Sequence, residues 1–124
     1  MNEPGLFDVI YNCRAMRRLE AREVPEDLLV KLIDAANQAP SGSNLQNAVW
    51  IVVRDAGVRQ QLADLNRAGV TAYLGGERQR VDGLQHQSAD KRSRMLDAVE
   101  WQMEHMHEIP ALIVACMDFG VPMN

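Results

Sequence analysis

The stretch Ala39-Pro40-Ser41-Gly42-Ser43-Asn44-Leu45-Gln46 separates an apolar helical pattern from an apolar strand pattern. Pro40 and Gly42 favour a turn at this point. The serine, asparagine and glutamine side chains place several hydrogen-bond donors and acceptors in one short loop. The pattern therefore predicts a polar binding loop between two buried elements, of a kind that suits the hydrogen-bonding edge of a heteroaromatic ring.

A second polar segment, Arg14-Ala15-Met16-Arg17-Arg18-Leu19, lies upstream and follows a short apolar helical pattern. Arginine side chains offer forked, charge-assisted hydrogen bonds that match phosphate oxygens. Taken alone, such a cluster is more often a solvated helix end. The polar loop downstream favours the alternative, in which Arg14 and Arg17 hold a phosphate group at the end of the first helix.

Composition limits the class of protein. The chain has 124 residues, of which 47% are hydrophobic and 24% charged, as expected for one small globular domain covering residues 1–124. Its formal net charge of -4 argues against nucleic-acid binding by bulk electrostatics. Cys13 and Cys116 have neither metal-site nor disulfide spacing. With no signal-peptide or membrane-spanning pattern, we expect no membrane partner and a cytoplasmic location.

Hydrophobic periodicity predicts a chain in which helices alternate with short strands. The helix starting at Pro25 has an apolar face that ends at Ala36, before the polar loop. We expect helices over 5–13, 25–36, 58–65 and 89–107, buried strands over 49–53 and 111–116, a weakly ordered loop or partly helical excursion over 69–88, and a loop from Met117 to Asn124. The fold class is therefore α+β, with helices packed on a small central sheet.

The order of these features resembles the nitroreductase superfamily. An arginine cluster after a first helix, a Val-Pro helix start, an Ala-Pro-Ser-Gly-Ser-Asn-Leu-Gln loop, a Val-Val strand and a later Ile-Pro with an apolar strand occur in the family's order. The resemblance covers nearly the whole chain. It implies a homodimeric, FMN-dependent oxidoreductase that carries electrons from NAD(P)H to nitro, quinone or related electrophilic acceptors by a ping-pong mechanism.

The resemblance also implies a role for individual residues. Arg14 and Arg17 would hold the FMN phosphate, with Ala15 at the position where a serine usually contributes. The loop of the partner subunit would contribute the other four contacts, from Ser41, Gly42, Asn44 and Gln46. No catalytic acid or base is implied, since the flavin itself accepts and returns hydride.

The chain departs from the family pattern in three places. Ala15 offers only its backbone N–H, Leu19 stands where an aromatic residue is usual, and Asn47-Ala48 replaces the common Pro-Trp. Family members are also much longer, so the sequence resembles an amino-terminal half that is incomplete at its C-terminal side. The alternative function is therefore a non-catalytic, truncated fragment that does not retain flavin.

The remaining motifs favour structural roles. His105 and His107 lie two positions apart, which on a helix turns them about 200° from each other, so no metal site is expected. Met95, Met103 and Met106 are typical of core or dimer packing. Trp101 is a candidate for burial at an interface.

Overall fold

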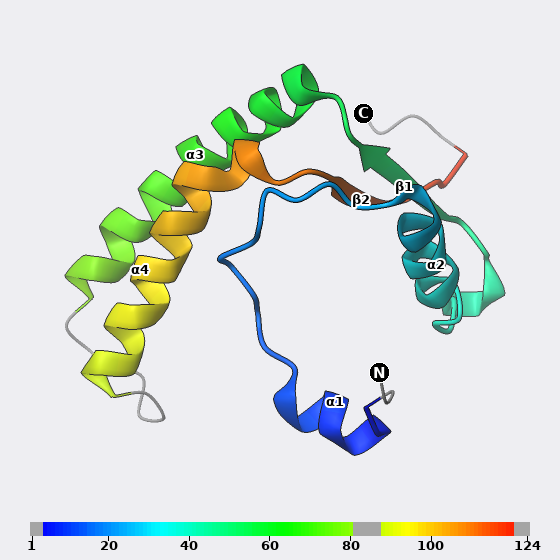
Figure 1. Ribbon diagram of the computed structural model, residues 1–124, viewed down its shortest axis with the longest axis horizontal. Helices are drawn as coiled ribbons and strands as arrows, with labels where there is room; N and C mark the ends of the chain where they lie inside the picture. The colour runs from blue at the N-terminus through cyan, green and yellow to red at the C-terminus, as the bar shows by residue number, and fades with distance from the viewer. Residues whose placement is uncertain (1–3, 81–87, 121–124) are drawn as a thin grey trace.

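The computed structural model describes residues 4–80 and 88–120. Its elements form an open arch, with a two-stranded sheet near the middle and helices at both ends (Figure 1). The fold class is the predicted α+β arrangement. The predictions for residues 81–87 and 121–124 lie outside the described part of the chain.

The sheet joins two segments that lie far apart in the sequence. Strand β1 (Ala48–Val53) pairs antiparallel with β2 (Leu112–Met117), and Ala48 lies opposite Met117 while Val53 lies opposite Leu112. Both strands are rich in β-branched residues, which favour extended backbone. The predicted strands are thus confirmed to within a residue of their ends, and Met117 belongs to the strand instead of the following loop.

Helix α2 (Glu26–Ala36) lies beside the sheet, at one end of the arch. Pro25 is the N-cap residue, and its fixed φ suits a helix start. Glu26 and Asp27 lie in the first turn, where the helix dipole stabilises their negative charge. Leu29 is buried at 5% exposure. The helix then leads into the polar loop, which contains the short 3-10 turn η1 (Gly42–Asn44).

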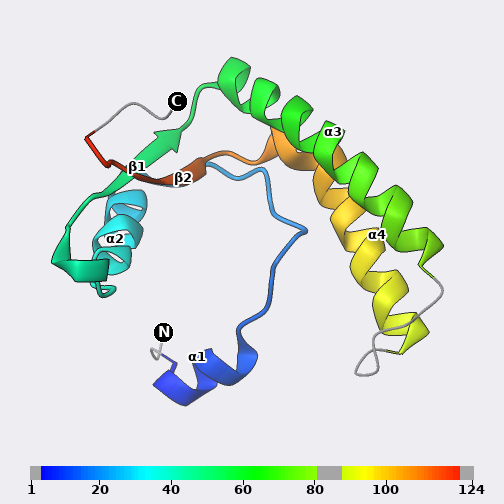
Figure 2. The same ribbon diagram turned by 180° about the vertical axis from the view of Figure 1, so that it is seen from behind.

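Helices α3 (Ala56–Gln79) and α4 (Ala89–His105) form a long hairpin that extends away from the sheet (Figures 1 and 2). Asp55 and Ser88 cap their N-termini by accepting hydrogen bonds from Val58 N and Lys91 N. A second 3-10 turn, η2 (Met106–Glu108), leads from α4 toward β2. Ala63, Leu74 and Leu96 are buried between the elements of this hairpin.

For the segment from residue 69, the sequence predicts a weakly ordered loop or a partly helical excursion. The structure has helix as far as Gln79, so the helical alternative is confirmed there and the weakly ordered loop is wrong. Gly75 and Gly76 lower the intrinsic helix propensity of this segment by about 1 kcal/mol each. Contacts with α4 outweigh that cost. Leu74 is 5% exposed, and Glu77 accepts a 2.7 Å hydrogen bond from Arg92 on α4.

The first helix, α1 (Leu6–Asn12), is short and has no buried residue. An extended segment links it to the rest of the chain, from which it stands apart in Figures 1 and 2. Its large apolar side chains remain mostly exposed, namely Leu6 at 71%, Phe7 at 68%, Val9 at 50%, Ile10 at 55% and Tyr11 at 72%. The helix is therefore formed where predicted, without burying its apolar face in this chain.

Candidate functional site

The arginine segment lies directly after α1. Arg14 folds back onto the end of the helix, where its Nη1 donates to Tyr11 O at 3.0 Å and Cys13 O at 2.7 Å. These carbonyls are among those that a helix leaves without an intrahelical partner. Arg17 Nη1 lies 3.5 Å from Ala15 O, so each guanidinium keeps further N–H donors for another ligand.

No carboxylate lies within ion-pair distance of Arg14, Arg17 or Arg18 in the described residues. Elsewhere several arginines are paired, as Arg54 is with Glu23 at 2.8 Å and Arg92 with Glu77 at 2.7 Å. The segment therefore carries positive charge that this part of the chain does not neutralise. Such a segment suits a phosphate group.

The polar loop has an unusual backbone. Ser43, Asn44 and Gln46 have φ angles of 50°, 54° and 52°, in the left-handed region that residues with a Cβ seldom adopt. Strained backbone of this kind costs about 1–3 kcal/mol per residue and clusters at binding sites. Hydrogen bonds inside the loop hold the conformation.

Two of these bonds join predicted site residues. Gln46 N donates to Ser41 Oγ at 3.0 Å, and Gln46 Nε2 donates to Asn44 Oδ1 at 2.7 Å. A Cβ added at Gly42 would meet no atom within 4 Å, so a flat ring could approach the backbone there. The loop therefore brings Ser41, Gly42, Asn44 and Gln46 together, as a site for a polar ring requires.

The two halves of the predicted site are not joined within this chain. No hydrogen bond links the segment of Arg14, Ala15 and Arg17 to the loop in the described residues, and η1 and the end of α1 lie apart in Figure 1. A single described chain thus presents a phosphate-binding half and a ring-binding half separately.

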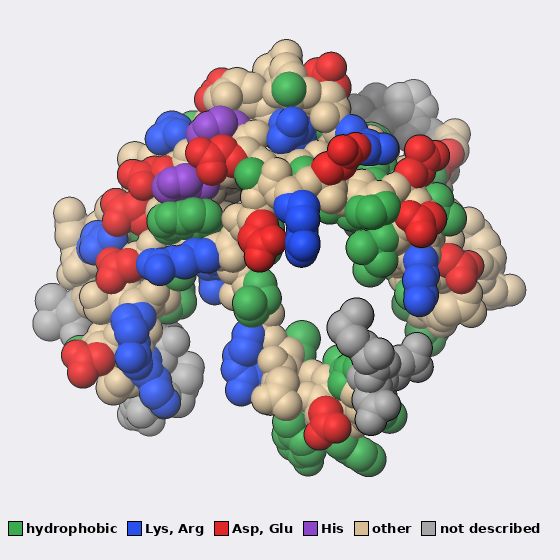
Figure 3. Space-filling model, in the orientation of Figure 1, with side chains coloured by type: hydrophobic (Ala, Val, Ile, Leu, Met, Phe, Trp, Pro, Cys, Tyr) green, Lys and Arg blue, Asp and Glu red, His purple; other side chains and the backbone are tan. Residues whose placement is uncertain are grey.

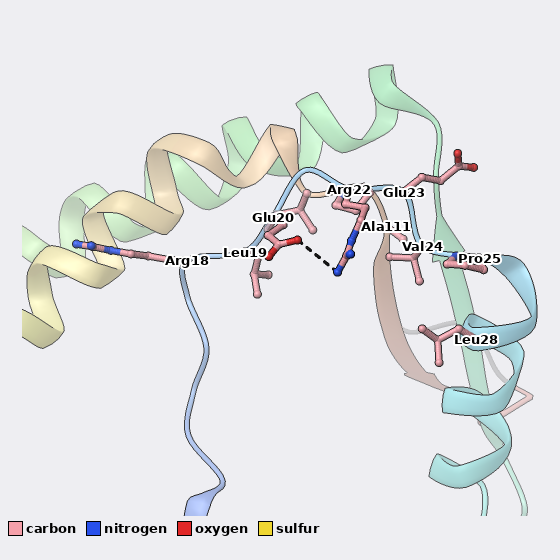
Figure 4. Close-up of a pocket in the computed structure, with 11 residues that line it drawn as sticks. Arg18, Leu19, Glu20, Arg22, Glu23, Val24, Pro25, Leu28 and Ala111 are labelled. Carbon is pink, nitrogen blue, oxygen red and sulfur yellow. Dashed lines mark ion pairs between the residues drawn. The ribbon is translucent and has the colours of Figure 1, made fainter. Parts of the chain in front are cut away.

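A cavity of about 620 Å³ is lined by the extended segment from Arg18 to Pro25, by Leu28 of α2 and by residues 109–111. Figure 4 shows Val24 and Leu28 beside it, and Glu20 facing Arg22, with which it forms a 3.4 Å ion pair. None of the seven predicted flavin residues lines this cavity. We therefore do not assign it to the candidate site.

Two contacts at the loop were not foreseen in the sequence. Trp50 Nε1 donates to Asn37 Oδ1 at 2.8 Å, and Asn47 Nδ2 donates to Asp118 O at 3.1 Å. These contacts hold the segments on either side of the loop. Helical and strand spacing could have placed Asn37 and Trp50 on facing surfaces, but not at bonding distance.

The residues expected to be structural have local partners. Trp101 is half-buried and stacks on His105, with ring centroids 4.1 Å apart. For His107, Nε2 lies 3.8 Å from Oε1 of Glu108. No cluster of three potential metal-ligating side chains occurs within residues 4–80 and 88–120. Within the same ranges, no helix has the length and hydrophobicity needed to cross a bilayer.

Two solved structures of flavoproteins have a fold similar to that of this chain. A structure of oxidised iodotyrosine deiodinase bound to FMN and 3-iodo-L-tyrosine matches with a TM-score of 0.66 and 21% identity, over 95% of this chain and 59% of the other. A BluB-like flavoprotein from Clostridium difficile 630 matches with a TM-score of 0.57 and 23% identity, over 91% of this chain and 48% of the other. At these identities the likeness establishes the fold alone.

The chain thus spans roughly half the length of these two flavoproteins. No curated protein matches it. The sequence model of the Nitroreductase family matches residues 10–121, a range that contains both the arginine segment and the polar loop. The chain therefore belongs to the Nitroreductase family.

Proposed function

We propose that this chain is a subunit of a homodimeric, FMN-dependent oxidoreductase. The observation that carries the proposal is the conformation of the polar loop. Ser43, Asn44 and Gln46 have left-handed backbone angles, and they lie next to Ser41 and Gly42 in the loop. A loop held in this way presents its polar groups without further rearrangement. The family membership supports the same assignment, as do Arg14 and Arg17, which have no carboxylate partner among the described residues.

In this proposal the chain's residues bind and orient the cofactor. Arg14 and Arg17 hold the phosphate with N–H donors, and Ala15 adds its backbone N–H. Ser41, Gly42, Asn44 and Gln46 lie against the ring. When bound, FMN supplies the redox chemistry, taking hydride from the donor and returning electrons to the acceptor. The protein contributes position and access, so no side chain needs to act as an acid or base in the hydride step.

The dimer is proposed because each half of the site needs a counterpart. The arginine segment of one subunit would meet the loop of its partner, which explains why one chain leaves the halves apart. The exposed apolar side chains of α1 support this assembly, since burying Phe7 and Ile10 against another subunit would remove them from water (Figure 3).

The proposed electron donor is NADH or NADPH, which leaves before the acceptor enters in a ping-pong exchange. The proposed acceptors are nitro compounds, quinones and related electrophiles. An iodinated tyrosine belongs in the acceptor panel, because a protein of similar fold binds one.

The first test is the visible spectrum of the purified chain after mixing with FMN and removing free flavin by gel filtration. We expect retained flavin absorbance at about one FMN per subunit in a dimer. Arg14→Gln should weaken FMN binding by at least about tenfold, because a charge-assisted phosphate contact is worth about 1.5–3 kcal/mol. The matched control is Arg94→Gln, which removes an exposed arginine of α4 and should leave binding unchanged.

The alternative is a non-catalytic fragment that does not retain flavin. The many exposed apolar side chains favour it, since the described core is limited to Leu29, Val53, Ala63, Leu74 and Leu96. A colourless protein after gel filtration, with Arg14→Gln indistinguishable from the unmodified chain, would support this alternative and overturn the oxidoreductase. Retained flavin that is bleached anaerobically by NADH or NADPH, and restored by an acceptor, would exclude it.

A further inference from the structure

The C-terminal end of α2 is tied to the sheet by one side-chain hydrogen bond. Leu29, Ile33 and Asn37 follow one another at four-residue spacing, which places them on one side of the helix and its C-terminal cap. Trp50 and Val52 share one face of β1, because side chains alternate along a strand. The 2.8 Å bond from Trp50 Nε1 to Asn37 Oδ1 connects these two surfaces.

The apolar packing between α2 and β1 buries Leu29 but leaves a cavity beside it. A cavity of about 490 Å³ lies between α2 and β1, and Leu29, Ile33 and Val52 line it. Trp50 is half-buried, and its 2.8 Å hydrogen bond to Asn37 is exposed to solvent. The Asn37–Trp50 bond adds a direct polar contact that helps to fix the separation between the end of α2 and β1.

The distance between the end of α2 and β1 also sets the distance between the two ends of the polar loop. Asn37 lies just before the loop and Trp50 just after it, while Asn47 at its far end is held by Asp118 N, which donates to Asn47 O at 2.9 Å. A loop with both ends held cannot relax the left-handed backbone at Ser43 and Gln46 by moving its ends apart. Contacts at the two ends of the loop thus add to the hydrogen bonds inside it, which also hold its conformation.

We propose that Asn37 and Trp50 are positioning residues for the flavin site, which they serve by holding the 41–46 loop in its binding conformation across the α2–β1 gap. This inference rests on the proposed function for its flavin step. Neither side chain needs to touch the cofactor. Both act through the loop, by fixing the distance between its two ends.

The test compares variants that remove the bond with variants that keep it. Trp50→Phe removes the donor, and Asn37→Leu removes the acceptor at similar size. Asn37→Asp keeps an acceptor oxygen, and Trp101→Phe makes the same change as Trp50→Phe at a half-buried tryptophan of α4. A common retained fold is checked first by circular dichroism and thermal unfolding.

The first readout needs no flavin. In flavin-free protein, the amide protons of Asn44, Leu45 and Gln46 donate to Ser41 O, Gly42 O and Ser41 Oγ. We expect Trp50→Phe and Asn37→Leu to speed their hydrogen exchange by at least about fivefold, the scale of one lost hydrogen bond. Asn37→Asp and Trp101→Phe should stay within about twofold of the unmodified chain.

The second readout is the dissociation constant for FMN, from quenching of flavin fluorescence. The same two bond-removing variants should weaken FMN binding by at least about fivefold, and the Asn37→Leu/Trp50→Phe double variant by no more than either alone. Additive losses in the double variant would show that the two residues act separately, and would overturn the inference.

Other outcomes separate this inference from the proposed function. Unchanged exchange in Trp50→Phe and Asn37→Leu overturns the positioning role, whatever flavin does. Faster exchange with unchanged FMN affinity overturns it as well. If the unmodified chain binds no FMN, the proposed function fails and the flavin step fails with it, while faster exchange in the variants would still show that the pair orders the loop.

Discussion

The α3–α4 hairpin buries apolar side chains, whereas helix α1 leaves its apolar side chains exposed. The hairpin buries Ala63, Leu74 and Leu96 at 2%, 5% and 4% exposure, and the Glu77–Arg92 pair links its helices at 2.7 Å. In α1 no residue is buried, and Phe7 and Tyr11 are 68% and 72% exposed. The two helices of the hairpin thus pack their apolar side chains against each other, whereas the apolar side chains of α1 are not packed in this chain.

This difference bears on where stability and assembly reside. A helix as short as α1 is marginal in water unless its apolar face is packed. The hairpin already supplies such packing, because each helix covers the other. Changes in the hairpin should therefore alter the free energy of unfolding, and changes in α1 should alter association in the proposed dimer.

The largest expected effect comes from the hairpin core. Leu96→Ala should reduce the free energy of unfolding by about 2–5 kcal/mol, because it removes buried methyl groups and leaves a cavity. Urea denaturation followed by circular dichroism measures the change. The matched control is Leu65→Ala on α3, where the side chain is 72% exposed and the loss should be below about 0.5 kcal/mol. Equal losses at the two positions would contradict the contrast.

The next effect tests α1 and rests on the proposed dimer. Ile10→Ser should weaken dimerisation by about tenfold, since a partly buried isoleucine at an interface contributes about 1–2 kcal/mol. Sedimentation equilibrium measures the constant. Unfolding of the diluted protein serves as the control and should be unchanged, because Ile10 is 55% exposed in the single chain. An unchanged dimerisation constant would show that α1 is not part of the dimer interface.

A smaller effect of opposite sign is expected in α3. Gly75→Ala should stabilise the protein by about 0.4–1 kcal/mol, because alanine restricts the unfolded chain and favours helix. The added Cβ would meet no atom within 4 Å. An increase in Tm measures the gain. A decrease would mean that the helix through residue 75 is not the stable conformation.

The smallest effect is expected in the extended segment between α1 and α2. Arg22 pairs with Glu20 at 3.4 Å, with 84% and 77% of the two side chains exposed. Such surface pairs contribute little, so Arg22→Gln should change unfolding by less than about 0.5 kcal/mol. Thermal unfolding at low and high salt checks this. A larger, salt-sensitive loss would show that the segment is held more tightly than its exposure indicates.

Much of the fold could be predicted from local patterns. The apolar spacing of α2 and the β-branched runs of β1 and β2 predicted those elements nearly to the residue. The second half of α3 was predicted only as a loop or a partly helical excursion, because Gly75 and Gly76 disfavour helix locally and contacts with α4 offset them. Tertiary packing overrides local propensity at this point.

The candidate site divides in the same way. Its composition was evident in the sequence, since Arg14, Arg17 and the 41–46 loop are recognised by residue type and order. Its geometry was not. The bond between Asn37 and Trp50 depends on how α2 lies against β1, which no local pattern specifies, and the left-handed backbone at Ser43 is not evident from residue type.

The sequence by itself determined the family, the order of helices and strands, and the residue types of the proposed flavin site, because these follow from short-range pattern and composition. Only the tertiary structure decided that α3 continues through its glycines, that the loop is held at both ends, and that α1 keeps its apolar face exposed. Those outcomes depend on contacts between residues far apart in the chain, whose energies exceed local preferences.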